Sequence, residues 1–226
     1  MNKILSFLLD WSEVWAPLIP LFILFLYRNQ PKILKPVTIY IGLAWVLNLM
    51  IDFIWVFKKY LPPWLQSNNP IYNIQSLVRF ICFSLFFSGL PQNFFKPLRL
   101  ILPFIFFSFF ILNFGLWENF FNPLHLSGNL LSAESYLLLI YCMLYYLAEL
   151  RDDHEELING PKFWVVTGLS LYVVVSFFVF LFYVPMNSLN GDLSDAMWNF
   201  HNIAFIIFCL FLAIAFYEPF RNKYSV

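Results

Sequence analysis

The residues of this chain most able to do chemistry are polar side chains that fall inside long apolar stretches. An ionisable residue in a lipid bilayer costs about 2.5–3.5 kcal/mol on the insertion scale, so each one needs a structural or functional reason. Trp45, Asn48 and Asp52 lie at positions i, i+3 and i+7, which places them on one face of a helix. Gln75 and Arg79 share a face in the same way. A stripe that mixes aromatic and polar groups is typical of a pocket for a small polar or amphipathic ligand.

We therefore predict an outward-facing cavity in which Arg79 pairs with Asp52 or Glu134. At 1.5 Å per residue, the polar groups lie roughly 6–13 Å below the outer membrane surface, and the inner half carries no amide or charge. The residues expected to line the cavity are Trp45, Asn48, Asp52, Asn73, Gln75, Arg79, Glu134, Trp198, Asn199, His201 and Asn202. The alternative is that these groups only hold the helices together through hydrogen bonds.

An intramembrane hydrolase is a further alternative, in which Asp52, Glu134 and His201 bind a metal ion. Of the three histidines, only His201 lies inside an apolar stretch. The chain has no GxSxG, HExxH or glycine-rich phosphate-binding motif. We therefore expect no catalytic residues, no bound metal and no cofactor.

The composition indicates which elements must position these groups. Hydrophobic residues make up 61% and charged residues 12% of the 226 residues, whereas soluble domains have about 45–50% and about 25%. The sequence therefore predicts an all-α integral membrane protein, with the lipid bilayer as its first partner. The net charge is zero and the basic residues are scattered, so nucleic acid is not an expected partner. Residues 1–226 should form a single transmembrane domain, because no connection is long enough for another.

Seven stretches are long and apolar enough to form spanning helices, which need about 20 residues each. Short connections rich in Pro, Asn and Gly separate them. The first apolar run is interrupted by Asp10 and Glu13, and we expect its helix to extend back to Leu8. The expected helices cover about residues 14–27, 37–57, 71–89, 98–117, 130–150, 163–184 and 197–216.

The basic residues favour an orientation with the N-terminus outside and the C-terminus in the cytosol. Nine Lys and Arg residues follow the first, third, fifth and seventh stretches, and three lie on the opposite side. The two longest outer connections, 118–129 and 185–196, contain no Lys or Arg. We expect the protein in the inner (plasma) membrane of a bacterium.

An internal repeat is indicated by the start of two stretches. Residues 71–76 and 197–202 both read apolar, aromatic, Asn, apolar, polar, polar, at an offset of 126 positions. The same offset aligns Gly42-Leu43-Ala44 with Gly168-Leu169-Ser170. The pattern predicts two parallel three-helix repeats joined by a connecting helix.

This 3+1+3 arrangement resembles the SWEET sugar transporters and the PnuC-type vitamin transporters, and more distantly the opsins. In SWEET proteins, an Asn on the third helix and another on the seventh line the substrate site, and Asn73 and Asn199 hold those places here. The prolines that gate the cytosolic side of SWEET proteins are only partly matched. Pro17 and Pro20 lie in the first helix, but the fifth and sixth have none before Pro185. The last helix also has no Lys for the retinal linkage of an opsin.

Two function classes follow from this pattern. A receptor- or sensor-like protein needs an outer ligand pocket and a signalling partner. The acidic loop 151–156 is a candidate docking point for such a partner, and the alternative is that it is simply a solvated acidic loop. A small-solute transporter needs a route through both halves, and the inner half lacks polar lining. We expect the receptor- or sensor-like function and keep the transporter as the alternative.

Overall fold

The computed structural model describes residues 3–62, 65–91, 96–122, 126–151, 160–189 and 191–221, and in these ranges it contains helices and no strand. Six of the helical segments are long and apolar enough to cross a membrane. This confirms the prediction of an all-helical chain of the multi-pass membrane type. The long helices are α4 (Lys35–Phe57), α5 (Asn69–Ser88), α6 (Lys96–Leu112), α7 (Gly128–Arg151), α8 (Pro161–Leu189) and α9 (Gly191–Arg221). Short turns η1 (Lys32–Leu34), η2 (Lys58–Tyr60) and η4 (Asn113–Trp117) flank α4 and end α6.

The first apolar segment differs from the single helix that was expected over about 14–27. It consists of three short pieces, α1 (Lys3–Asp10), α2 (Ser12–Trp15) and α3 (Leu18–Leu26). Pro17 precedes α3, and its ring excludes the hydrogen bond and the space that a continuous helix needs. The indole of Trp15 donates to the carbonyl of Leu8 across the first break (2.8 Å). The prediction of one unbroken helix was therefore wrong for this segment.

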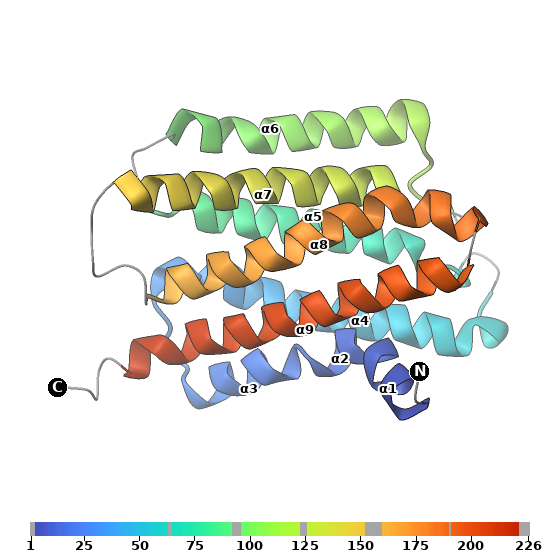
Figure 1. Ribbon diagram of the computed structural model, residues 1–226, viewed down its shortest axis with the longest axis horizontal. Coiled ribbons are helices and arrows are strands. Elements are labelled where there is room, and N and C mark those ends of the chain that lie inside the picture. The colour runs from blue at the N-terminus through green and yellow to red at the C-terminus, as the bar shows by residue number, and fades with distance from the viewer. Residues whose placement is uncertain are drawn as a thin grey trace.

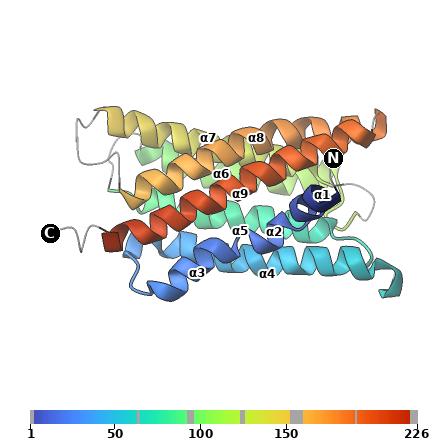
Figure 2. The same cartoon turned by 60° about the horizontal axis from the view of Figure 1, so that its bottom comes forward.

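The long helices pack side by side, and the broken segment runs along α9 (Figures 1 and 2). Helix α5 lies inside the bundle, and 61% of its most apolar 18 residues are buried, as for α7. Helix α6 lies at the edge, with only 17% of the corresponding residues buried. Its exposed side chains include Phe104, 74% exposed. A helix with so apolar an exposed face suits contact with lipid tails.

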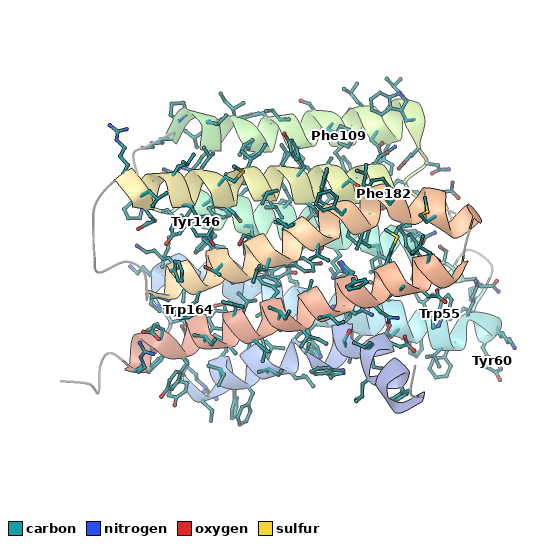
Figure 3. The ribbon with its side chains drawn as sticks, in the orientation of Figure 1. Trp55, Tyr60, Phe109, Tyr146, Trp164 and Phe182 are labelled. Atoms are coloured by element: carbon teal, nitrogen blue, oxygen red, sulfur yellow. The ribbon has the colours of Figure 1, made fainter. Side chains whose placement is uncertain are left out.

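Aromatic side chains fill the core and mark the two ends of the bundle. Trp55 and Tyr60 lie exposed near one end, and Tyr146 and Trp164 lie toward the other (Figure 3). Trp and Tyr at both ends are typical of the two membrane interfaces.

Hydropathy located α4, α5, α7 and the continuous segment of α6 and η4 within about three residues, but it underestimated the last two helices. Helix α8 continues to Leu189 instead of residue 184, and α9 covers Gly191–Arg221 instead of 197–216. Hydropathy marks only the apolar part of a helix, whereas the backbone hydrogen bonds continue into polar residues at its ends.

Candidate functional site

The centre of the polar site is a buried ion pair between α5 and α7. The guanidinium of Arg79 donates from Nε to Oε1 of Glu134 (2.5 Å) and from Nη2 to Oε2 (2.6 Å). Its Nη1 donates to the hydroxyl of Tyr172 on α8 (2.6 Å). The side chains of Arg79 and Glu134 are 4% and 0% exposed. Glu134 is one of the two partners that the sequence predicted for Arg79, and the two-point geometry is the strongest available to Arg.

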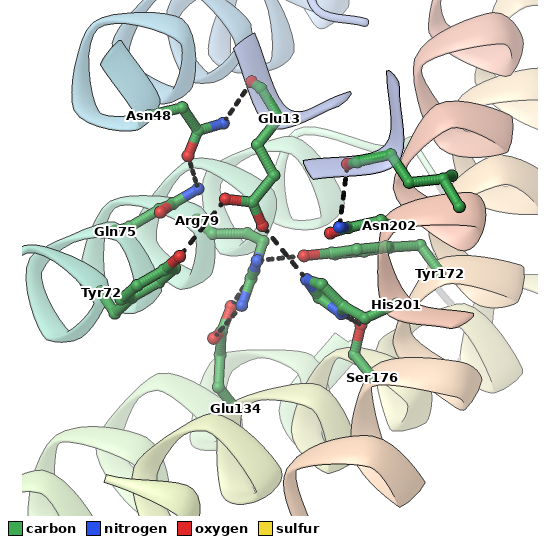
Figure 4. Close-up of polar contacts among 11 residues, drawn as sticks. Glu13, Asn48, Tyr72, Gln75, Arg79, Glu134, Tyr172, Ser176, His201 and Asn202 are labelled. Atoms are coloured by element: carbon green, nitrogen blue, oxygen red, sulfur yellow. Dashed lines mark hydrogen bonds and ion pairs between the residues drawn. The ribbon is translucent and has the colours of Figure 1, made fainter. Parts of the chain in front are cut away.

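A second carboxylate, that of Glu13 on α2, lies on the other side of this pair (Figure 4). The hydroxyl of Tyr72 donates to its Oε2 over 3.5 Å, and Nε2 of His201 lies 3.7 Å from its Oε1. The other ring nitrogen of His201 is 3.1 Å from the hydroxyl of Ser176 on α8. Hydrogen bonds to charged groups normally measure about 2.5–2.9 Å. Among the residues that the structure describes, the buried carboxylate of Glu13 is therefore held by long contacts alone.

Two asparagines bind the backbone of the broken N-terminal segment. The side-chain amide of Asn48 on α4 donates to the carbonyl of Glu13 (2.8 Å), and that of Asn202 on α9 donates to the carbonyl of Leu9 (3.0 Å). Gln75 on α5 then donates to Oδ1 of Asn48 (2.9 Å). A break leaves carbonyls without helical partners, and in a bilayer such groups must be satisfied by the protein. The side-chain amides of Asn48, Gln75 and Asn202 therefore hold helices together through hydrogen bonds, which is the alternative that the sequence left open.

The space between the polar groups is small. A cavity of about 10 Å³ lies among them, which corresponds to about one water molecule. The structure therefore has a closed polar centre in place of the open, outward-facing cavity that was expected. The lining residues are Glu13, Tyr72, Gln75, Arg79, Leu131, Tyr172, Phe180, His201 and Phe205.

Several predicted site residues lie around this centre without joining it. Trp198 packs its ring against Tyr72 and His201, with centroids 5.7 and 5.6 Å apart. Asn73 donates to the carbonyl of Phe120 (3.0 Å), so it ties α5 to the connection after α6.

The remaining predicted residues, Trp45, Asp52 and Asn199, are also outside the cluster. The indole nitrogen of Trp45 and Oδ2 of Asp52 are buried with no hydrogen-bond partner in the described chain. Asn199 is partly exposed. Asp52, the other partner expected for Arg79, forms no ion pair with it within the described residues.

The structure does not bring Asp52, Glu134 and His201 together as ligands of one metal ion. Across the part of the chain that the structure describes, no three His, Cys, Asp or Glu side chains come together to hold a metal ion. The reason is local, because both carboxylate oxygens of Glu134 accept hydrogen bonds from Arg79.

Sequence reasoning missed Glu13, Tyr172 and Ser176 as members of the site. Glu13 was considered only as an interruption of the first apolar run, although it lies within the helix that was expected to extend back to Leu8, and in the structure it is buried on α2. Tyr172 and Ser176 lie four residues apart on α8, so they share a face. That spacing could have identified them.

Comparisons with known proteins found no matching family model, no matching curated protein and no matching solved structure.

Proposed function

We propose that this chain is a seven-pass protein of a bacterial inner membrane that binds a small polar ligand at the centre formed around Glu13 and Arg79. In this proposal it acts as a receptor- or sensor-like module, with its N-terminus outside and its C-terminus in the cytosol. It passes the ligand signal from the helical bundle to a partner protein.

The observation that carries the proposal is the loosely held carboxylate of Glu13. Both carboxylate oxygens of Glu134 accept short hydrogen bonds from Arg79, so the charge of Glu134 is balanced within the protein. Glu13 is similarly buried, yet its contacts to Tyr72 and His201 measure 3.5 and 3.7 Å. A buried polar group without close partners is unfavourable. A ligand that carries a hydrogen-bond donor would supply the missing partner.

The position of Glu13 also supports a binding role. Glu13 lies on α2, close to the break that separates α2 from α3. In many transporters and related membrane proteins, broken helices form the ligand site, because the break frees backbone groups near the middle of the bilayer. Pieces separated by a break can move more easily than a continuous helix, which gives the closed centre a way to open.

The packing toward the other end of the bundle favours a receptor over a transporter. Tyr40, Phe83 and Phe208 are completely buried there, with ring centroids 5.0–6.2 Å apart. Tyr172 stacks on Phe208 at 5.2 Å and connects this aromatic layer to Arg79. A solute would have to separate these rings to cross, whereas a sensor needs the centre to open to one side only.

Cysteine accessibility tests the proposal. In a version with Cys82, Cys142 and Cys209 replaced by Ala, single cysteines are placed at Asn48, Gln75 and His201 in the centre. Other single-cysteine versions carry a cysteine at Ser170 or retain the native Cys142, both toward the opposite end. A cysteine at the exposed Asn119 is the positive control. A membrane-impermeant thiol reagent is added from outside to intact cells.

We expect slow labelling of the central positions, faster than at Cys142 and slower than at Asn119. Labelling that also reaches Ser170 would favour the transporter, because the reagent would have passed through the aromatic layer. No labelling of the centre at all would reject a ligand site and leave a purely structural cluster.

A further inference from the structure

A groove separate from the polar centre lies on the surface between α4 and α5. Its volume is about 510 Å³. It shares no lining residue with the central cavity. Its walls are Lys32, Lys35, Pro36, Ile39, Leu43, Val78, Ile81, Cys82 and Leu85.

The groove has a charged end and an apolar body. Lys32 and Lys35 lie at the start of α4 and are both exposed, and no acidic residue is among the lining residues. The body is formed by apolar side chains that the bundle leaves open. Ile39 is 47% exposed, Leu43 44% and Leu85 59%.

The direction of the groove follows from the two helices. The side chain of Ile33, just before α4, lies against Gly89 at the end of α5, so the helices run antiparallel and the lysines mark one end of both. From Lys35 to Leu43 the groove follows α4 for about 12 Å. In a bilayer, lysines that flank a span lie at the level of the headgroups. The groove would therefore lead from the headgroups into the hydrocarbon.

We propose that this groove binds an anionic phospholipid, with its phosphate between Lys32 and Lys35 and one acyl chain along Ile39, Leu43 and Ile81. The distribution of charge and apolar surface in the groove matches that of such a lipid. Basic residues between membrane helices are a known means of selecting anionic headgroups. In the orientation proposed above, the lipid belongs to the cytosolic leaflet, but its binding does not depend on the proposed ligand site.

Cys82 provides a built-in probe of the groove. It lines the groove and is 7% exposed, whereas Cys142 and Cys209 are 0% exposed. In the purified full chain in detergent, we would measure alkylation of Cys82 by N-ethylmaleimide with phosphatidylglycerol, with phosphatidylcholine and without added lipid. The mass of the intact complex would report the bound lipid at the same time.

Phosphatidylglycerol should slow alkylation of Cys82 and remain bound, and phosphatidylcholine should do so only at much higher concentration. The variant K32Q/K35Q should need about 10- to 30-fold more phosphatidylglycerol for the same protection. The matched control is K58Q/K59Q, which removes the same charge from the other end of α4, where the lysines do not line the groove. It should behave like the wild type.

Three results would overturn the proposal. Phosphatidylcholine could protect Cys82 and stay bound as well as phosphatidylglycerol does, which would show a groove without headgroup selectivity. K32Q/K35Q could keep full affinity for phosphatidylglycerol by mass. Inorganic phosphate alone could give the same protection, which would show an anion site without a lipid. If Cys82 proves unreactive, the retained mass of phosphatidylglycerol decides among these outcomes.

Discussion

At the scale of single residues, two buried carboxylates differ in how their charge is satisfied. Glu134 receives two short hydrogen bonds from Arg79, which also donates to Tyr172. The carboxylate of Glu13, within the described part of the chain, has the two long contacts to Tyr72 and His201. Removing one partner of a buried ion pair leaves the other charge uncompensated, whereas removing a loosely held charge leaves no such deficit.

The first prediction compares these two acids by the same substitution. Glu134→Gln should reduce the free energy of unfolding by about 3–5 kcal/mol, because it leaves Arg79 as a buried, unpaired cation. Glu13→Gln should change it by less than about 1 kcal/mol, because the amide can still form hydrogen bonds in the same space. Reversible denaturation in mixed micelles would measure both.

The double variant R79M/E134M serves as the control for this comparison. It removes both charges together and should be more stable than Glu134→Gln alone, because no buried charge remains. Equal losses for Glu134→Gln and Glu13→Gln would contradict the assignment of Glu13 as the more loosely held of the two acids.

A second prediction concerns two neighbouring asparagines of α9. Asn202→Ala should cost about 1–3 kcal/mol of unfolding free energy, because it leaves the carbonyl of Leu9 without its hydrogen bond. Asn199→Ala is the matched control and should be nearly neutral, because Asn199 is partly exposed and forms no hydrogen bond within the described residues. The same denaturation assay applies, and a large loss at Asn199 would argue against this assignment.

At the scale of the elements, the proposed repeat equates two helix pairs that pack differently. Gly42 on α4 and Gly168 on α8 align at the offset of 126 residues. A Cβ atom added at Gly168 would lie 2.5 Å from Cβ of Phe211 on α9, whereas one added at Gly42 would have no atom within 4 Å. Helices α8 and α9 are thus in close contact at Gly168, while α4 and α5 leave the open groove between them.

This difference gives a third prediction. Gly168→Ala should destabilise the protein by about 1–3 kcal/mol, because Phe211 and its helix must move. Gly42→Ala should be neutral or stabilising by up to about 1 kcal/mol, because Ala is the better helix former and has room here. Thermal unfolding of the two variants beside the wild type would measure the contrast. A loss at Gly42 as large as that at Gly168 would show that the two pairs pack alike.

The elements also show how far the sequence could predict the molecule. The long apolar stretches alone predicted where α4 to α9 lie, because a helix that crosses a bilayer needs about 20 mostly apolar residues. The break of the first segment depends on Pro17 acting together with the packing of α1 and α2 on α9, which hydropathy does not register. The polar pattern predicted Asp52 or Glu134 as the partner of Arg79, and the structure contains the pair with Glu134. The contacts of Glu13 with Tyr72 and His201 join α2 to α5 and α9, and contacts between segments so far apart in the sequence do not follow from an apolar pattern.

At the scale of the whole molecule, the positions of the two chain ends depend on whether the number of membrane crossings is odd or even. The described chain begins at one end of the bundle and finishes at the other (Figures 1 and 2). Within the described residues, six helices are long and apolar enough to span a membrane. The segment Ser12–Leu26, which contains α2 and α3, is shorter. If this segment also crosses, the count is odd and the termini lie on opposite sides of the membrane. If it does not, the termini lie on the same side.

The final prediction follows from this parity. We expect a green fluorescent protein fused after Val226 to fluoresce, because that reporter folds in the cytosol. An epitope tag placed before Met1 should be cleaved by a protease added outside the cell. The distribution of basic residues gives the direction, with nine on the C-terminal side and three on the other. A tag that is protected while the fusion fluoresces would mean that α1 to α3 enter and leave by the same face. That result would contradict both the seven-pass topology and the position of the two chain ends at opposite ends of the bundle (Figures 1 and 2).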